Sequence, residues 1–448
     1  MPTFNSRGRP ILFSRENTLY KLPALFLLIW GILAGCASTN RQSTEANREF
    51  ATTQNLQGTF ALPQQKAPPE DIQSIQLHPQ GKAGSAPVIS LQTSQKLVLS
   101  FDYLDTESRQ FYVELSHRSQ NWDPSGISPS TYLDSFSRAY IQKSVASYGN
   151  QPAYRHVSFS FPNNEIRPVV SGNYLLEVYS YEDKLLFSLP FFITEDRGSL
   201  TTRIERLYAQ RKDGRPLHQP FFTYRIPPIV EYPQFDLFAS FAPNQFWGQM
   251  RKADFTDTIT PGELSGRLSR NHAFIGNYEF KYLDLRSFDP DGRQILEYNP
   301  AQPSPEIILR RDIQNLDTNF RFPAISEVGL PENDRNNNYA RARFSLETEH
   351  NISDKSEIYL VGDFNNWMIN ELNKMNFDST KSLWTGQALI KQGQYAYKYV
   401  LVTENRIEDL ALDQGFLSPT QEYFTFIYFQ DPEQHYDRLL KIDRLIVN

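Results

Sequence analysis

Short runs in which apolar and polar residues alternate dominate the chain after residue 72. Successive side chains of a strand point to opposite faces of a sheet, so this period of two predicts half-buried β-strands. Clusters of turn-forming residues, such as Ser171-Gly172-Asn173, separate the runs. Short strands with such punctuation are typical of a β-sandwich. The strands predicted in this first region are 97–102, 111–115, 156–161, 174–179 and 185–189.

The same pattern continues through two further regions. Its strands in the second region are 235–241 and 278–285, and in the third they are 358–361, 383–389, 393–401, 423–429 and 439–447. A polar stretch at 329–338 predicts a domain boundary or an exposed hairpin between the two. Segment 121–150 has aromatic residues at a spacing compatible with a helix, but it also contains prolines, and we expect a long loop there.

These regions predict an all-β protein with three consecutive immunoglobulin-like or early-set β-sandwich domains. Aromatic residues make up 14% of the chain, and bulky side chains suit a pleated surface. A lipoprotein signal peptide and a flexible tether are expected to precede the sandwiches. The predicted boundaries are 1–35 for the signal peptide, 36–69 for the tether, 70–196 for the N-terminal sandwich, 197–336 for the middle sandwich and 337–448 for the C-terminal sandwich.

The N-terminus has the organisation of a secretory signal. A basic segment precedes an apolar run at 22–35, which is shorter than the roughly 20 residues that a membrane-spanning helix needs. The basic segment is long for this role, which leaves a start downstream of Met1 open. The run ends in Leu33-Ala34-Gly35-Cys36, which resembles the bacterial lipobox. We therefore predict that a lipid is attached to Cys36; the alternative is an uncleaved membrane anchor with an incidental cysteine.

The residues after Cys36 predict where the anchor lies. Ala37 and Ser38 are not acidic, and no acidic cluster follows closely. In lipoproteins, an aspartate after the cysteine often signals retention at the inner membrane, so we expect an outer-membrane lipoprotein on the periplasmic face. The segment up to residue 69 is polar and poor in apolar residues, and about 30 such residues span on the order of 30 Å as a coil.

Composition and motifs argue against several classes of function. The net charge is −6 and no basic stripe is present, so we do not expect nucleic acid as a partner. The seven histidines are scattered and the single cysteine is expected to carry a lipid, so we predict no metal, no cofactor and no disulfide. No G-x-S-x-G elbow or P-loop occurs. Acid pairs such as Glu347/Glu349 are expected to be solvated surface charge, and we predict no catalytic residues and no enzyme.

One local motif resembles a carbohydrate-binding fold. Gly362-Asp363-Phe364-Asn365-Asn366-Trp367, with 393–398 after it, is similar to the glycogen-binding early-set modules of starch enzymes. That resemblance implies sugar-binding roles for Trp367 and Lys398. The family also expects a second tryptophan after the lysine-bearing strand, and 402–406 has none. We therefore expect Trp367 to pack a sandwich turn and do not expect tight binding to glycogen or starch.

The folded part as a whole resembles the plug protein family of the type IX secretion system. The residues that carry this resemblance lie at 171–179, at Asn271 with 278–286, at 359–367 and at 423–429 with 436–439. It implies a non-catalytic periplasmic component of the secretion machinery, which occludes the periplasmic opening of a large outer-membrane translocon barrel. The implied partners are that barrel and, through the lipid anchor, the membrane.

Two other functions stay open at this point. One is a carbohydrate-binding outer-membrane lipoprotein of a glycan-uptake system, suggested by Trp367 and Lys398. The other, less well supported by the residues, is a hydrolase that uses a pair of carboxylates. Resemblance across all three regions favours the secretion component over both.

Overall fold

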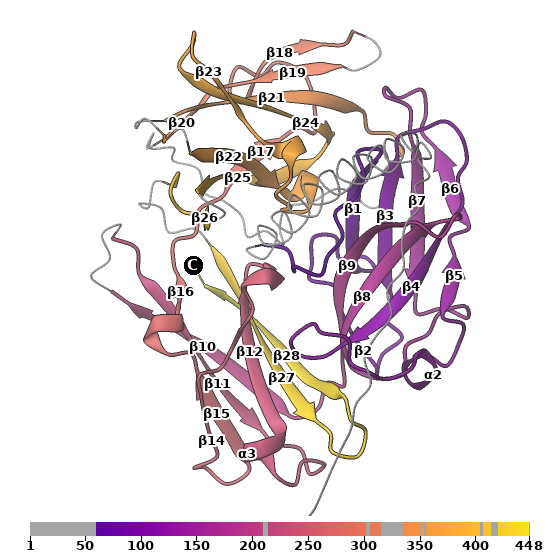
Figure 1. Cartoon of the computed structure of the whole chain (residues 1–448), viewed down its shortest axis with the longest axis vertical. Coiled ribbons are helices and arrows are strands. Elements are labelled where there is room, and N and C mark those ends of the chain that lie inside the picture. Colours follow the sequence, from indigo (N-terminus) through magenta and orange to yellow (C-terminus); the bar gives the residue numbers. More distant parts are fainter. Residues whose placement is uncertain are drawn as a thin grey trace, which may run out of the picture. The chain divides into compact units, whose positions relative to one another are not determined.

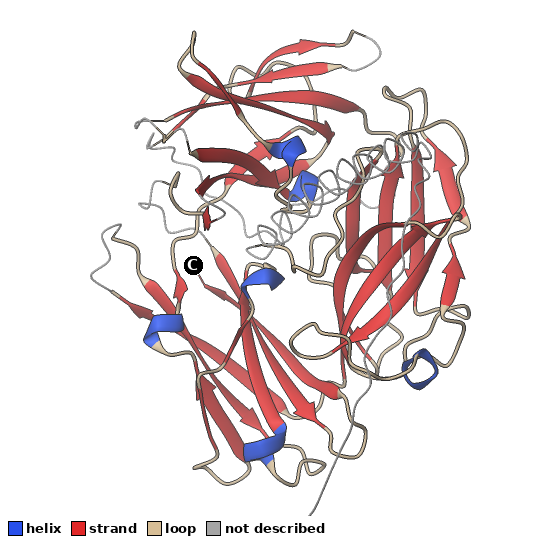
Figure 2. Cartoon of the chain, in the orientation of Figure 1, coloured by secondary structure: helices blue, strands red, loops and turns tan. Residues whose placement is uncertain are grey.

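The computed structural model describes residues 60–208, 214–301, 305–314, 335–348, 352–353, 355–403, 406–413 and 420–447. Strands dominate these residues, and the helices among them are single short turns (Figure 2). The all-β prediction is confirmed. The strands form pairs of sheets that pack face to face, and each pair encloses an apolar core, as in a β-sandwich (Figure 1).

The first sandwich contains the strands predicted for its region. One sheet has the order β1 (Ile72–Pro79), β3 (Leu97–Tyr103), β7 (Arg155–Phe161), β6 (Lys143–Ala146), and the other has the order β2 (Val88–Ser90), β9 (Leu185–Thr194), β8 (Gly172–Ser180), β4 (Phe111–Arg118), β5 (Arg138–Tyr140). The inward faces bury a large aromatic core that includes Phe101, Phe161 and Tyr174. The segment predicted as a long loop contains α2 (Pro129–Tyr132) together with β5 and β6, which form one border of each sheet.

The middle sandwich is built from two distant parts of the chain. One sheet contains β10 (Ser199–Leu207), β11 (Leu217–Arg225), β15 (Glu263–Arg267) and β14 (Phe255–Asp257), with β16 (Phe274–Ile275) on β11. The other has the order β13 (Arg251–Lys252), β12 (Leu237–Pro243), β27 (Gln421–Gln430), β28 (Asp437–Val447). The short helices α3 (Pro233–Asp236), η1 (Trp247–Gln249) and η2 (Arg270–His272) lie between these strands in the sequence.

The third sandwich lies, in sequence, inside the middle one. Its smaller sheet has the order β17 (Lys281–Asp284), β25 (Gln394–Thr403), β22 (Ser356–Gly362), with β26 (Arg406–Glu408) on β25. Its larger sheet has the order β18 (Ile295–Asn299), β19 (Glu306–Leu309), β21 (Tyr339–Glu347), β24 (Leu383–Lys391), β23 (Asn376–Asp378), with β20 (Asp312–Ile313) on β21. The turns η4 (Asp363–Asn365) and η5 (Glu371–Asn373) follow β22.

The strand pairing departs from the predicted boundary at 336/337. Strands β17 to β20 precede that boundary but pair within the third sandwich, and β27 and β28 follow it but complete the middle sandwich. The long pairing of β12 with β27, from Leu237↔Phe429 to Pro243↔Tyr423, makes this assignment unambiguous. Alternation along a strand reveals which side chains face a core, but it does not reveal which distant strand is the neighbour.

The predicted tether is also too long. Of the segment 36–69, residues 60–69 are described, and Phe60, Leu62 and Gln65 are buried. Phe60 packs edge-on against Phe246, with ring centroids 4.9 Å apart. Two large apolar residues in a polar stretch are enough to fasten it, because burying each removes a side chain's worth of apolar surface from water.

Candidate functional site at the junction of the three sandwiches

The predicted site residues meet different outcomes. Cys36 lies outside the described residues, so its lipidation stays a prediction. Trp367 and Lys398 are described, and the side chains of both are buried, with 8% and 2% of their surface exposed. A sugar needs an open aromatic face to stack on or an exposed donor to bind, and the ring of Trp367 and the ammonium group of Lys398 are both buried. Trp367 lies instead where residues of all three sandwiches meet, and Lys398 lies between the third and middle sandwiches.

The turn that carries Trp367 is built by its own asparagines. The side chain of Asn365 accepts a hydrogen bond from the backbone N–H of Gly362 (2.9 Å) and donates one to the carbonyl of Leu360 (3.0 Å). Asn366 and Trp367 have the positive φ angles 54° and 56°, a conformation that asparagine tolerates better than most residues. This local geometry turns the chain after β22 and directs Trp367 away from the core of its own sandwich.

Trp367 joins an aromatic cluster whose members come from separate parts of the chain. Its ring centroid lies 5.8 Å from that of Phe60, 5.1 Å from that of Phe246 and 5.3 Å from that of Phe280. Such edge and tilted contacts stabilise an interface beyond the area that they bury. The cluster therefore fastens the 60–69 segment to the middle and third sandwiches.

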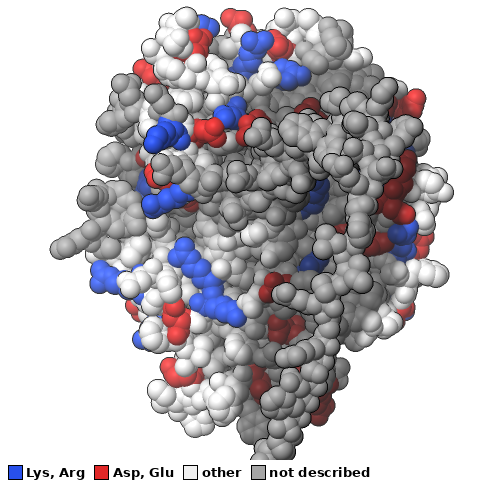
Figure 3. Space-filling model, viewed as in Figure 1, with Lys and Arg blue, Asp and Glu red and all other residues white. Residues whose placement is uncertain are grey.

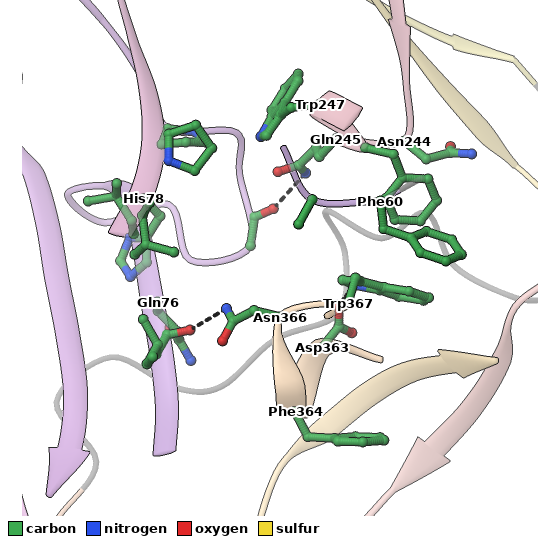
Figure 4. Close-up of a pocket in the computed structure, with 18 of the residues that line it drawn as sticks. Phe60, Gln76, His78, Asn244, Gln245, Trp247, Asp363, Phe364, Asn366 and Trp367 are labelled. Atoms are coloured by element: carbon green, nitrogen blue, oxygen red, sulfur yellow. Dashed lines mark hydrogen bonds between the residues drawn. The ribbon is translucent and has the colours of Figure 1, made fainter. Parts of the chain in front are cut away.

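A cavity of about 210 Å³ opens beside this cluster (Figure 4). Its wall includes residues 74–78 of the first sandwich, 244–247 of the middle one and 363–367 of the third. Two hydrogen bonds cross it: Asn366 Nδ2 donates to the carbonyl of Ile75 (3.1 Å), and Gln245 Nε2 donates to the carbonyl of Gly84 (3.1 Å). The cavity is thus enclosed by interfaces and not by one domain.

Asp363 is the ionisable group of this turn. Its Oδ1 accepts a hydrogen bond from Trp367 Nε1 (2.9 Å) and its Oδ2 accepts one from the backbone N–H of Ala396 (2.6 Å). Burial raises the pKa of Asp363 to about 7, against the opposing effect of these two hydrogen bonds. The carboxyl group fixes both the indole ring and the start of β25.

Lys398 belongs to a buried charge cluster between the third and middle sandwiches. Its ammonium group is hydrogen-bonded to the carboxylate of Asp413, donates to the carbonyl of Glu279 (3.1 Å) and lies 4.4 Å from the ring centroid of Tyr278. Arg215 of the middle sandwich approaches the same carboxylate at 3.8 Å. Burial raises the pKa of Asp413 despite the attraction of Lys398. The lysine is thus fully engaged inside the protein.

A second cluster joins the first sandwich to the third. Asp102 on β3 is fully buried, and its carboxylate accepts hydrogen bonds from His156 Nδ1, Tyr339 OH and Lys391 Nζ, each at 2.7 Å. Lys391 also lies 4.5 Å from the ring centroid of Tyr154. Close by, Asn150 Nδ2 donates to the carbonyl of Asn336 (2.7 Å), so the polar stretch near the predicted boundary docks on the first sandwich.

A third cluster joins the first sandwich to the middle one. Arg438 on β28 donates two parallel hydrogen bonds to the carboxylate of Glu195, both at 2.7 Å, and a third to Asp431 (2.7 Å). Burial alone would raise the pKa of Glu195, but the hydrogen bonds from Arg438 and Ser171 outweigh it and the pKa is lowered. Beside this cluster Phe192 packs against Trp247 with ring centroids 4.9 Å apart.

Each pair of sandwiches is therefore joined by an ion pair that is buried or, at Arg438, partly buried. Buried ion pairs contribute little net stability, but losing one partner strands a charge, so they favour one mutual arrangement over others. This site can therefore hold the three domains in one mutual arrangement. Sequence reasoning missed Asp102, Lys391 and Arg438, because a charged residue in an alternating strand resembles an outward-facing one, and it missed Glu195, which directly follows β9.

The described residues were also compared with the requirements of a metal site and of a membrane-spanning helix. No group of histidine, cysteine, aspartate or glutamate among the described residues is arranged to hold a metal ion. None of the described helices is long and apolar enough to cross a membrane. On the face shown in Figure 3 basic and acidic side chains are interspersed.

Comparison with known families identifies one segment. Residues 72–195 match the family model of the type 9 secretion system plug protein 1st domain. This range begins with β1 and ends directly after β9, so it coincides with the first sandwich. A search of curated proteins found no relative that matches this sequence.

Solved structures show that the whole fold occurs elsewhere. A hypothetical protein from Parabacteroides merdae ATCC 43184 is 20% identical, with a TM-score of 0.77, over 86% of this chain and 99% of that chain. The likeness thus extends over all three sandwiches, but at this identity it concerns the fold alone. The BSP domain of a biofilm associated protein is 8% identical over 85% of this chain and 60% of that chain. Its TM-score of 0.19 does not indicate a shared fold.

Proposed function

We propose, from the match of residues 72–195 to the family model of the type 9 secretion system plug protein 1st domain, that this chain occludes the periplasmic opening of the system's large outer-membrane translocon barrel. It acts without catalysis, as a cell-envelope component of type IX secretion. The family match to the first sandwich is the observation that carries the proposal. The proposed role as a plug rests on two further features: the interfaces between the sandwiches and the N-terminal segment.

The junction supports a role as a stopper. A body that blocks a channel must resist deformation, because a domain that swings aside reopens the path. Domains joined by small polar interfaces move relative to one another. Here Asp102–Lys391 and Arg215–Asp413 lie buried, and Glu195–Arg438 lies partly buried, at the three interfaces, and each penalises separation because parting would expose or strand a charge.

The proposed membrane attachment comes from the N-terminus. Lipid on Cys36 would hold the chain at the periplasmic face of the outer membrane. Residues 37–59 then separate the anchor from Phe60, the first residue of the described body. A coil of that length spans about 25–30 Å. Such tethering raises the local concentration of the body near any partner in the same membrane.

The glycan-uptake alternative loses its motivation in this structure. It rested on Trp367 and Lys398, and the first is packed among Phe60, Phe246 and Phe280 while the second pairs with Asp413. No other observation on the described residues favours it.

Deletion in a strain that also lacks any other subunit able to occupy the barrel tests the proposal. An unoccupied wide channel passes solutes that an intact outer membrane excludes, so we expect uptake of vancomycin to rise. Re-expression of the full chain should restore the barrier. Unchanged permeability, together with failure of the chain to co-purify with a large barrel, would overturn the proposal.

A further inference from the structure

Large apolar side chains are exposed together on two loops of the middle sandwich. Ile229, Tyr232 and Phe235, on the loop from β11 to β12 that includes α3, are 36%, 58% and 70% exposed. Ile259, on the β14–β15 turn, is 86% exposed. We name these four residues the apolar tip. Figure 1 shows α3 and β14 at the same end of this sandwich.

The two loops are held in place relative to each other. The backbone N–H of Ile226 donates to the carbonyl of Gly262 (2.9 Å), which ties the start of the first loop to the end of the second. Val230 is buried in the core of the sandwich, and Pro227, Pro228 and Pro233 restrict the backbone between them. The tip is thus a preorganised surface, which loses little conformational entropy on binding.

Its apolar character is not explained by the fold. Single exposed apolar residues are common on soluble proteins, but several on adjoining loops mark an interaction surface. The first sandwich offers a contrast: Tyr181 is 63% exposed, but it stands in a turn followed by Glu182, Asp183 and Lys184.

The charged residues within the two loops of the tip are all acidic. Glu231 and Asp236 lie on the first loop, and Asp257 and Glu263 flank the second. Neither 226–236 nor 256–263 contains lysine or arginine. The nearest basic residue in the strand pairing, Arg225, stands opposite Glu263 at the base of the loops. An acidic border disfavours anionic lipid headgroups and nucleic acid, and it complements a basic protein surface.

We propose that the apolar tip is the docking surface of this chain for its protein partner, and that it enters an apolar socket rimmed by lysine and arginine side chains. The apolar residues supply the buried centre and the four carboxylates form the polar rim, which is the usual anatomy of a protein interface. Resting on the proposed function, this assigns the partner as the translocon barrel. The tip then marks the part of the plug that meets the barrel wall.

Photo-crosslinking in living cells tests the docking surface. A photoreactive phenylalanine analogue replaces Phe235 or Ile259 in the full chain, and the same analogue at Tyr181 serves as the matched control. We expect adducts with one large outer-membrane barrel at the tip positions, at least tenfold more than at Tyr181. Adding Glu231→Lys and Asp257→Lys should lower the tip adducts about tenfold, because the charge complementarity is reversed.

The outcomes separate the two proposals. The docking surface would be overturned if the adduct yield were equal at all positions or if adducts formed with lipid only. It would also be overturned if the charge reversals left the yield of the tip adducts unchanged. If the barrel still co-purifies and permeability still rises on deletion, the plug proposal survives that result. Charge-dependent tip adducts with an envelope protein that is no barrel would refute the barrel as the partner of the tip, while the permeability and co-purification results would still decide the plug proposal.

Discussion

Lys391 on β24 and Asp102 on β3 form an ion pair between the third and first sandwiches, with 2.7 Å between Nζ and Oδ2. Both side chains are almost completely buried, with 3% and 1% of their surface exposed. The pair is not isolated, since His156 and Tyr339 hydrogen-bond to the same carboxylate. This ion pair therefore links the first and third sandwiches, and its contribution to stability can be measured.

We expect Lys391→Met to destabilise the chain by about 3–5 kcal/mol, because it leaves the carboxylate of Asp102 buried without its cation. Adding Asp102→Asn should restore part of that loss. Denaturant unfolding of the two single variants and the double variant gives the coupling energy. The control is Arg167→Met, which breaks the exposed pair Arg167–Asp134 and should cost at most about 1 kcal/mol. An equally mild effect at Lys391 would contradict the role of the buried pair.

Trp367→Ala should act through stability and not through sugar binding. Removing a packed tryptophan side chain costs about 3–5 kcal/mol, whereas Phe377→Ala, at a residue 53% exposed, should cost less than about 1 kcal/mol. Neither the unaltered chain nor the variant should bind glycogen tightly in a sedimentation assay. Micromolar binding of glycogen that Trp367→Ala abolishes would instead support the carbohydrate-binding hypothesis.

The burial of Asp363 predicts a pH dependence of stability. Its pKa is raised from 3.8 to about 7 in the folded chain, so between these values the folded state holds a proton that the unfolded state has released. This group's contribution is therefore largest at low pH and falls by roughly 1.4 kcal/mol for each pH unit as the pH rises through that window. Asp363→Asn should remove this slope. Parallel unfolding curves for both proteins at every pH would show that the carboxyl group does not titrate there.

The segment that begins at Phe60 should behave as part of the folded body. Phe60→Ala removes a ring packed against Phe246 and Trp367 and should cost about 3–5 kcal/mol. The same change at Phe136, which is 71% exposed, should have an effect within about 1 kcal/mol. Equally small changes in the free energy of unfolding at both positions would indicate that residues 60–69 belong to the tether and not to the folded body.

Lipidation at Cys36 can be tested separately from the fold. The basic segment, the apolar run and the small residues before the cysteine motivate it. Cys36→Ser should leave an unprocessed precursor that does not incorporate labelled palmitate. Maturation and labelling of the variant at wild-type level would exclude the anchor.

The sequence predicted the strands better than their partners. The runs around Phe101, Phe161 and Tyr174 are local patterns of period two, and each occurs as a strand with those residues in the core. The pairing of β12 with β27 depends on contacts between distant segments, which no local pattern encodes. Strand β27 is an example: its polar residues Glu422 and Thr425 are buried, because both faces of the strand are covered.

The candidate site was harder still to predict. Asp102 and Lys391 occupy positions that alternation assigns to solvent, and only the apposition of two sandwiches makes those positions interior. The missing second tryptophan led us to expect that Trp367 packs a sandwich turn, and its ring lies against Phe60, Phe246 and Phe280. Its partners Phe60 and Phe246 could not be inferred, since Phe60 belongs to the predicted tether and Phe246 lies between the predicted strands 235–241 and 278–285.

The completion of the middle sandwich by β27 and β28 imposes an order on assembly. A chain that emerges N-terminus first presents β10 to β16 long before β27 and β28 exist, and the third sandwich must appear in between. Until then the free side of β12 and the inner face of its sheet stay uncovered, and such edges invite pairing with other chains. During biogenesis the middle sandwich is therefore incomplete for a time, and a holdase chaperone is most needed then. Pairing of β27 with β12 ends this period.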